Sequence, residues 1–172
     1  MRGWLLDTNV VSELRKPKPA PAVTEFVAAQ AGELLFTTEI TFGEIRFGLE
    51  QLEDPARRAD IHSWLDRILR PLFAGRVLAI TEDVIVRWKT MVVEGQKRRH
   101  TFGQPDLFIA AIAALEDLVV VTRDTSELVA AGVPAFDPWS SVLHAGGKET
   151  AIQAPAAVEV VAEVVLGERR GR

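Results

Sequence analysis

The sequence predicts a three-layer α/β fold, in which a parallel sheet of four to five strands is covered by helices on both faces. Three observations predict it. Short apolar runs alternate with helix-like stretches over roughly the first 140 residues, as in parallel sheets with crossover helices. The run LVVVT at 118–122 is apolar at successive positions, which indicates a strand buried on both faces. The stretch PDLFIAAIAALED from Pro105 is apolar on nearly every side, which indicates a buried helix.

The elements of the first half are bounded by proline and glycine. A short strand is predicted over 4–6, and a helix follows it, with Val10, Val11 and Leu14 on one face. This helix must end before Pro17, because a proline disfavours helical geometry in the residue before it. The next predicted elements are a helix from Pro21 to Gly32, a strand over 33–38, a helix over 42–52, a helix with an apolar stripe over 61–72 and a strand over 76–80.

The second half continues the alternation. An apolar stripe over 84–92 predicts a helix, and a polar loop over 95–104 leads to the buried helix that begins at Pro105. After the strand at 118–122 we expect a short helix over 125–131 and a last strand at 133–136. Each predicted strand is therefore separated from the next by helical sequence, as a parallel sheet requires.

The chain changes character after residue 144. We expect one domain over 1–144 and an appendage over 145–172. The stretch AGGKETAIQAP resembles a linker, and AAVEVVAEVVLGERRGR predicts one weak helix or a partly disordered segment. In that helix Val158, Val161 and Val165 would share one side.

Composition narrows the possible functions. The chain has 172 residues, 48% hydrophobic and 26% charged, as in ordinary globular domains. It has no cysteine, which excludes disulfides, thiolate zinc sites, iron–sulfur clusters and a cysteine nucleophile. No apolar run approaches the roughly 18 residues of a membrane span, and no signal-peptide core is visible. We therefore expect a cytoplasmic protein that does not associate with membranes. The formal charge of −4 argues against a broadly basic nucleic-acid surface, but leaves room for local basic patches.

Four acids recur at one kind of position. Asp7 ends the first strand, and Glu44 lies near the start of the helix after the second. Asp106 opens the buried helix, and Asp124 lies two residues beyond LVVVT. In a parallel sheet the strand C-termini and the following helix N-termini share one edge, where ligands bind. The spacing therefore predicts that the four carboxylates meet at that edge.

Helix capping offers a competing interpretation of each acid. Asp7 and Asp124 suit N-cap positions, and Asp106 suits the helix macrodipole. Thr41 and Glu44 match a capping box. Taken singly, each acid fits a structural role about as well as a functional one.

The acids taken together point to a cation. Two carboxylates about 4 Å apart repel by roughly 4 kcal/mol at an effective dielectric of 20, so a group of three or four requires neutralisation. Without cysteine, and with only three histidines, the fitting ions are Mg²⁺ or Mn²⁺, which prefer carboxylate oxygens and water. Such ions support hydrolysis of phosphodiester bonds.

These motifs resemble a PIN domain, specifically a VapC-type toxin ribonuclease of the FitB-like branch. The matching stretches are LLDTNVVSEL, ITFGEIRFGLEQL, PLFAGRVL, PDLFIAAIA, VVVTRDTSEL and VPAFDPW, and they cover about residues 4–139. The resemblance implies a PIN-like fold and a Mg²⁺- or Mn²⁺-dependent endoribonuclease that cleaves RNA. It also implies a homodimer, possible higher assemblies, and inhibition by a cognate antitoxin protein.

The resemblance also assigns roles to residues. Asp7, Glu44, Asp106 and Asp124 match the acidic quartet that holds the metal and carries catalysis. Thr8 and Asn9 match the polar residues that orient the first acid or a water molecule, and Ser12 and Thr122 are further candidates for that role. Many relatives carry Asn where Asp124 stands and an acid three residues later, so Glu127 is the alternative fourth acid.

Basic residues near these acids are candidates for RNA contacts. Lys97, Arg98 and Arg99 precede the Asp106 helix and could contact phosphates. They equally suit the C-terminal end of a helix, where cations complement the dipole. Similar candidates close after the Asp7 helix are Arg15, Lys16 and Lys18.

Two other functions compete with the nuclease. Phosphatases of the haloacid dehalogenase type need Asp-x-Asp followed by Thr, but Asn9 and Val11 occupy those positions here. A noncatalytic PIN-like module would act through dimerisation and through complexes with its antitoxin and DNA. The intact acids favour the nuclease over that module.

Overall fold

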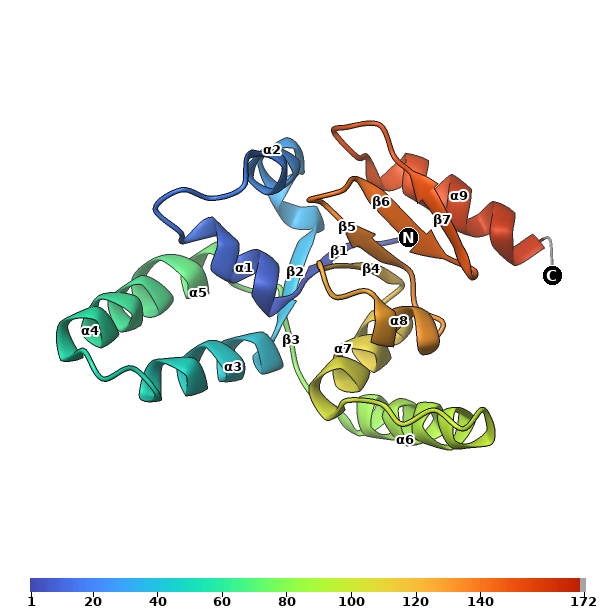
Figure 1. The fold of residues 1–172 in the computed structure, drawn as a ribbon, viewed down its shortest axis with the longest axis horizontal. Helices are drawn as coiled ribbons and strands as arrows, with labels where there is room; N and C mark the ends of the chain where they lie inside the picture. Colours follow the sequence, from blue (N-terminus) through green and yellow to red (C-terminus); the bar gives the residue numbers. More distant parts are fainter. Residues whose placement is uncertain (171–172) are drawn as a thin grey trace.

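A central sheet organises the chain, which the computed structural model describes from residue 1 to residue 170 (Figure 1). The described residues form seven strands in the order β3-β2-β1-β4-β5-β6-β7. The strands are β1 (Gly3–Leu6), β2 (Leu35–Thr38), β3 (Val77–Leu78), β4 (Leu118–Val121), β5 (Ala135–Asp137), β6 (Val142–Ala145) and β7 (Lys148–Ala151). The first five are mutually parallel, and β6 and β7 are antiparallel. The predicted parallel α/β sheet is therefore confirmed in its five-strand part.

The antiparallel hairpin is an addition to the prediction of four to five strands. Gly146 and Gly147 have φ angles of +60° and +83°, in the left-handed region that two-residue hairpin turns use. The segment expected to resemble a linker after residue 144 is therefore partly a strand. The expected boundary between 144 and 145 falls inside β6.

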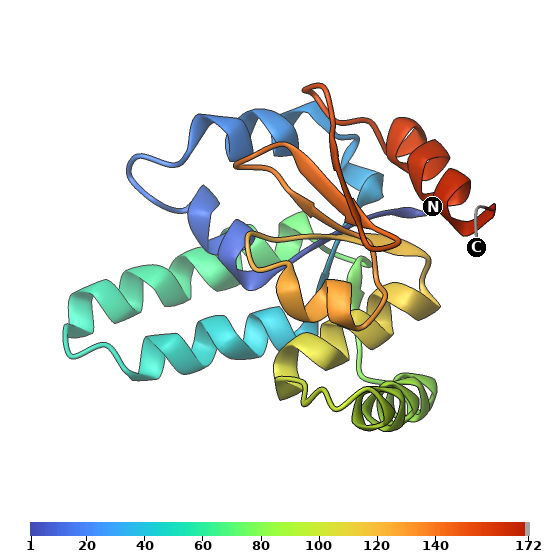
Figure 2. The same cartoon turned by 45° about the vertical axis from the view of Figure 1, so that its right-hand side comes forward.

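Helices cover both faces of the sheet, as predicted (Figures 1 and 2). They are α1 (Thr8–Leu14), α2 (Pro21–Ala29), α3 (Glu39–Glu50), α4 (Pro55–Trp64), α5 (Arg70–Leu72), α6 (Glu82–Lys97), α7 (Gln104–Leu115), α8 (Ser126–Ala130) and α9 (Val158–Arg170). A π-helical stretch, Leu65–Leu69, joins α4 to α5, and a short 3₁₀ helix, Gly32–Leu34, precedes β2. Both views show α3 and α4 projecting side by side away from the sheet.

Two cores lie on the two faces of the sheet. Trp4 and Leu6 of β1 pack in the core formed with α1, α2, α3 and α9. Leu5, between them, packs in the core formed with α6, α7 and α8. This alternation along one strand follows from the twofold period of β structure. A strand buried on both faces is therefore apolar throughout, as the sequence indicates.

Three helices differ in extent from the prediction. The helix α3 begins at Glu39, three residues earlier than expected, because the Thr38 side chain caps it by accepting a hydrogen bond from the Thr41 amide. The helix α4 begins at Pro55, with Asp54 as its N-cap. The helix α6 extends to Lys97, into the expected loop.

The helix α9 is packed onto the protein. Val158, Val161 and Val165 are all buried in the core, on the shared side that the sequence predicts. The Gln30 amide ties this region to β1, because it accepts a hydrogen bond from the Trp4 indole at 2.8 Å and donates one to the Ala156 carbonyl at 2.9 Å. Within residues 1–170, no helix combines the length and hydropathy needed to cross a membrane.

Candidate active site

The candidate site lies where neighbouring parallel strands end. Leu6 of β1 pairs with Val121 of β4, so the next residues, Asp7 and Thr122, lie side by side at the carboxyl edge. The Asp7 amide donates to the Val121 carbonyl at 3.1 Å, which continues the strand pairing to this point. The strand register therefore positions the first acid.

Asp7 has a structural role and also belongs to the polar network at this edge. It is the N-cap of α1, and its Oδ1 accepts a hydrogen bond from the Thr8 amide at 2.7 Å. Its Oδ2 accepts hydrogen bonds from Thr122 Oγ1 at 2.7 Å and from Asn9 Nδ2 at 2.9 Å. Capping therefore explains one carboxylate oxygen, and two side chains orient the other.

Thr122 is the centre of this network. Its buried hydroxyl donates to Asp7 and accepts from Asn9 Nδ2 at 2.7 Å and from the Asp124 amide at 3.0 Å. The hydroxyl thus fixes the Asp7 carboxylate relative to the chain that carries Asp124. The structure brings Thr122 and Asn9 together with Asp7, and their role in orienting that acid stays a prediction.

Glu44 reaches the same network through Thr8. The Thr8 hydroxyl donates a hydrogen bond to the Glu44 carboxylate, so α3 contributes an acid next to the start of α1. Since Thr38 caps α3, Glu44 lies in the second turn of that helix and the expected capping box with Thr41 is not formed. Capping therefore gives no account of this partly buried carboxylate.

The Asp106 carboxylate forms no hydrogen bond with residues 1–167, whose side chains the structure describes. It lies in the first turn of α7, whose N-cap, Gly103, has no capping side chain. Burial raises the pKa of Asp106 above its ordinary value of 3.8, and the carboxylates of Asp7, Asp124 and Glu127 raise it further. Asp106 therefore lies near acids from two other segments, the end of β1 and the stretch that follows β4.

Asp7 is coupled to the acids in the same way. Burial is the largest cause that raises the pKa of Asp7, and the hydrogen bonds from Thr122 and Thr8 oppose it. The carboxylates of Glu44 and Asp124 raise the pKa further. The four predicted acids are therefore close enough to interact electrostatically.

Asp124 and Glu127 occupy different surroundings. Asp124 is exposed, influences both Asp7 and Asp106, and does not cap α8, whose N-cap is Thr125. Glu127 Oε2 lies 3.3 Å from the Gly103 amide and 3.4 Å from His100 Nε2. Glu127 therefore holds the loop between α6 and α7, and the choice of Asp124 as the fourth acid stays a prediction.

The donor chemistry of these acids suits a hard divalent cation, although the side chains are not arranged as ligands. In the part of the chain that the structure describes, no three Asp, Glu, His or Cys side chains form a group that could hold a metal ion. Asp7 and Glu44 are instead turned toward protein donors. The convergence of the quartet on one metal stays a prediction. Asp106, whose carboxylate is free of hydrogen bonds, is the acid most available to a cation.

A pocket of about 560 Å³ adjoins the acids. Asn9 and Asp124 line it, together with exposed Ser12. Arg123 and Trp139 also line it, and the sequence analysis did not single out either residue. One signal was available for Arg123, which lies directly between Thr122 and Asp124.

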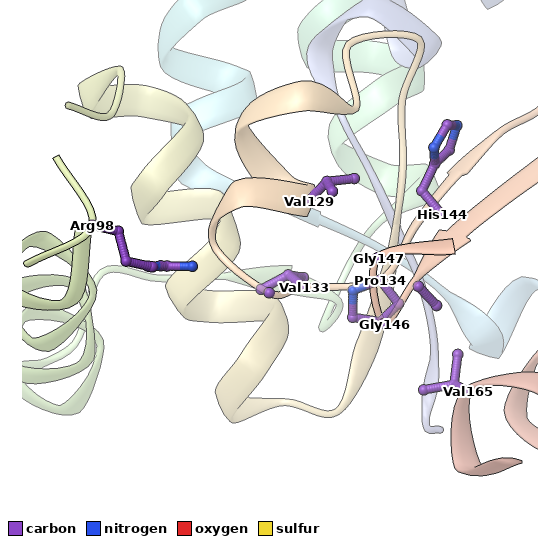
Figure 3. Close-up of a pocket in the computed structure, with 10 residues that line it drawn as sticks. Arg98, Val129, Val133, Pro134, His144, Gly146, Gly147 and Val165 are labelled. Atoms are coloured by element: carbon purple, nitrogen blue, oxygen red, sulfur yellow. The ribbon is translucent and has the colours of Figure 1, made fainter. Parts of the chain in front are cut away.

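The predicted basic cluster lies at the end of α6. Arg98 lines a different cavity of about 240 Å³ and points toward Val133 and Pro134, beside the glycines of the hairpin turn (Figure 3). No acid lines this cavity. Lys97 is the last residue of α6, and Arg99 has a left-handed φ of +58°. Their contact with RNA stays a prediction.

Comparisons with known proteins agree with this architecture. The model of the PIN domain family matches residues 4–131. The VapC ribonuclease Y4jK of Sinorhizobium fredii is 37% identical over 135 residues, which cover 78% of this chain and 96% of the relative. The toxin FitB of Neisseria gonorrhoeae is 34% identical over 135 residues, or 78% of this chain and 97% of FitB.

A solved structure extends the agreement to three dimensions. The crystal structure of FitAcB from Neisseria gonorrhoeae matches with a TM-score of 0.75 and 34% identity, over 79% of this chain and 98% of that one. Nearly all of that protein thus corresponds to part of this chain, and β6, β7 and α9 lie beyond the region that the family model matches. The chain belongs to the PIN-domain family, in the branch that contains FitB and VapC.

Proposed function

We propose that this protein is a Mg²⁺- or Mn²⁺-dependent endoribonuclease and the toxin of a toxin–antitoxin pair. The observation that carries the proposal is the proximity of acids from four segments at the carboxyl edge of the sheet: Glu44 and Asp124 act electrostatically on Asp7, and Asp7 and Asp124 act on Asp106. Coupling of this kind is unfavourable unless the site serves a charged ligand. A divalent cation held by carboxylates is the ligand that suits phosphodiester hydrolysis.

The residues divide into groups that bind the ion and groups that orient them. Asp7, Glu44, Asp106 and Asp124 would hold the cation, which when bound stabilises negative charge on the phosphodiester oxygens. Thr122 and Asn9 fix Asp7 through its Oδ2, and Thr8 fixes Glu44. Such supporting hydrogen bonds set the direction of each ligand before the substrate arrives.

The names of the relatives support the biological role. One relative is called a ribonuclease and another a toxin, and the 34–37% identity covers nearly their whole length. By this likeness the protein would cleave cellular RNA, form a homodimer and be held inactive by a cognate antitoxin.

Cleavage of single-stranded RNA by the purified protein tests the proposal. We expect cleavage with Mn²⁺ or Mg²⁺ and none with excess chelator. Asp106→Asn should reduce cleavage at least 100-fold, because it removes a charged ligand. Asp83→Asn is the matched control, since Asp83 also lies in the first turn of a helix, α6, but outside the acid group. Cleavage that survives Asp106→Asn or excess chelator contradicts the metal-dependent mechanism.

The noncatalytic alternative makes a different prediction. A binding module would associate with its antitoxin but would cleave no RNA at any metal concentration. If neither the wild type nor Asp106→Asn cleaves RNA, this alternative is supported. Cleavage by the wild type alone excludes it.

A further inference from the structure

The pocket beside the acids is lined by an arginine side chain, Arg123, that has no part in the proposed metal site. We call it the Arg123 pocket, and it is lined by Asn9, Ser12, Glu13, Lys16, Arg123, Asp124 and Trp139. It shares Asn9 and Asp124 with the acid group, and Asn9 Nδ2 is 2.9 Å from Asp7 Oδ2. A molecule in this pocket would therefore lie against the candidate active site.

Arg123 is exposed and available to a ligand. Its guanidinium forms no ion pair with residues 1–167, whose side chains the structure describes. Its backbone is fixed, because the Arg123 amide donates to Asn9 Oδ1 at 3.3 Å. A guanidinium presents a planar set of donors that matches the geometry of a phosphate.

Trp139 holds that guanidinium in place. The guanidinium carbon of Arg123 lies 4.1 Å from the centroid of the Trp139 ring, a cation–π contact. The Trp139 ring packs against the core, and its amide donates to Asp137 Oδ1 at 2.8 Å. Ser140 Oγ donates to the other oxygen of Asp137 at 2.7 Å, which closes the turn. The support under Arg123 is therefore rigid.

Lys16, the second cation of the pocket, is already neutralised. Its Nζ lies 2.5 Å from Oε2 of the buried Glu13, whose Oε1 accepts a hydrogen bond from the Ala20 amide at 2.9 Å. Asp124, the other acid of the pocket, interacts with Asp7 and Asp106. Arg123 forms no ion pair, and its charge acts on the pocket and also on Glu13, whose pKa it helps to lower. It therefore supplies positive charge next to acids that would otherwise repel a polyanion.

We propose that Arg123 binds a backbone phosphate of the RNA strand next to the cleaved bond, and that Trp139 positions Arg123 for this contact. The inference rests on the proposed ribonuclease function, because that function supplies the polyanion. The pocket of about 560 Å³ leaves room for part of a nucleotide beside Asn9 and Asp124. Arg123 would hold the strand while the acids act on the neighbouring phosphate.

Binding of a fluorescent single-stranded RNA in excess chelator tests the inference apart from cleavage. Arg123→Ala should weaken binding about tenfold, as expected for one charge-assisted contact of about 1.4 kcal/mol. It should also lower the slope of log affinity against log salt by about 0.7, the value for one phosphate contact on a single strand. Lys89→Ala removes the same charge from exposed α6, where Lys89 lies 5.7 Å from the centroid of the Trp88 ring, and should change neither quantity.

A double-mutant cycle tests the positioning role of Trp139. Trp139→Leu should weaken binding nearly as much as Arg123→Ala, and Trp139→Phe should restore most of the affinity because it keeps an aromatic face. In the Arg123→Ala background, Trp139→Leu should add no further loss. A purely structural role for Trp139 would give additive losses, which would overturn this part of the proposal. Circular dichroism checks that each variant is folded.

Kinetics in Mn²⁺ separate this inference from the proposed function. Arg123→Ala should raise KM about tenfold and leave kcat within a factor of three. If Arg123→Ala has the same affinity, salt slope and KM as the wild-type protein, the Arg123 inference is overturned. Cleavage of RNA by the wild-type protein would still support the nuclease in that case. If the wild-type protein does not cleave RNA, and Arg123→Ala still weakens RNA binding, the nuclease proposal is overturned. The phosphate contact of Arg123 would be supported in that case.

Discussion

Thr122 Oγ1 donates a hydrogen bond to Asp7 Oδ2 across 2.7 Å, from the end of β4 to the end of β1. The same hydroxyl accepts from Asn9 and from the Asp124 amide. One buried side chain thus links Asp7 and Asn9, after β1, to Asp124, after β4.

Replacing Thr122 by Val should reduce RNA cleavage about 10- to 100-fold, because the near-isosteric side chain removes the hydroxyl that orients Asp7. The hydrogen bond from Thr122 lowers the pKa of Asp7, so its loss should move the acidic limb of the pH–rate profile to higher pH. Thr122→Ser keeps the hydroxyl and should behave like the wild type. Equal activity and equal pH profiles in the Val and Ser variants would contradict the orienting role.

Asp106 should make the stability of the metal-free protein depend on pH. Because burial and neighbouring acids raise its pKa in the folded state, the folded protein binds more protons than the unfolded chain above pH 3.8. Its free energy of unfolding therefore falls as pH rises from 3.8 through the raised pKa, and the loss persists at neutral pH. Asp106→Asn should be more stable than the wild type in chelator at pH 7.5, and the difference should shrink toward pH 3.8. Urea unfolding at several pH values measures this difference in the free energy of unfolding. A difference that does not change with pH would contradict the prediction.

Metal binding should offset the loss of stability that the ionised Asp106 carboxylate causes in the metal-free protein. A ligand that binds only the folded state adds about 2.7 kcal/mol of stability at 100 times its Kd. We expect Mn²⁺ to raise the unfolding temperature of the wild type and to raise that of Asp106→Asn much less. Na⁺ at equal ionic strength controls for screening. A shift of the same size in both proteins would show that Asp106 is not a ligand.

Asp124 and Glu127 should differ in their effect on cleavage. Asp124 influences both Asp7 and Asp106, whereas Glu127 influences Asp106 and contacts His100 and the Gly103 amide. Asp124→Asn should therefore reduce kcat at least tenfold more than Glu127→Gln, at saturating Mn²⁺. The reverse order would make Glu127 the fourth acid.

Much of the fold follows from local sequence, and the differences have physical causes. Strands such as β4 are predictable because a strand buried on both faces must be apolar throughout. The hairpin of β6 and β7 is less visible, because β7 is an edge strand with mostly exposed polar residues. Its clearest signal is the Gly146–Gly147 turn, which the linker interpretation overlooked. The start of α3 depends on which of two nearby threonines, Thr38 or Thr41, becomes the N-cap.

The candidate site is predictable only in part. The order of strands and helices places Asp7, Asp106 and Asp124 at one edge, so these acids can be selected from sequence alone. The contact between Arg123 and Trp139 depends on how the turn after β5 folds back, and no sequence periodicity reports it. The directions of the carboxylates depend equally on tertiary hydrogen bonds, and so the sequence could not show that they are turned toward protein donors.

The helix α9 should contribute measurably to stability, although the sequence suggests only a weak appendage. Val161 is fully buried in the core, whereas its neighbour Val160 is 49% exposed. Val161→Ala should cost about 2 kcal/mol, from two buried methyl groups at roughly 0.8 kcal/mol each and the cavity they leave. In a chain of this size that loss lowers Tm by about 4–8 °C. Val160→Ala makes the same chemical change on the solvent side and should shift Tm by less than about 2 °C. Equal, small shifts in the two variants would mean that α9 does not share the core, and that residues 1–144 are stable without it.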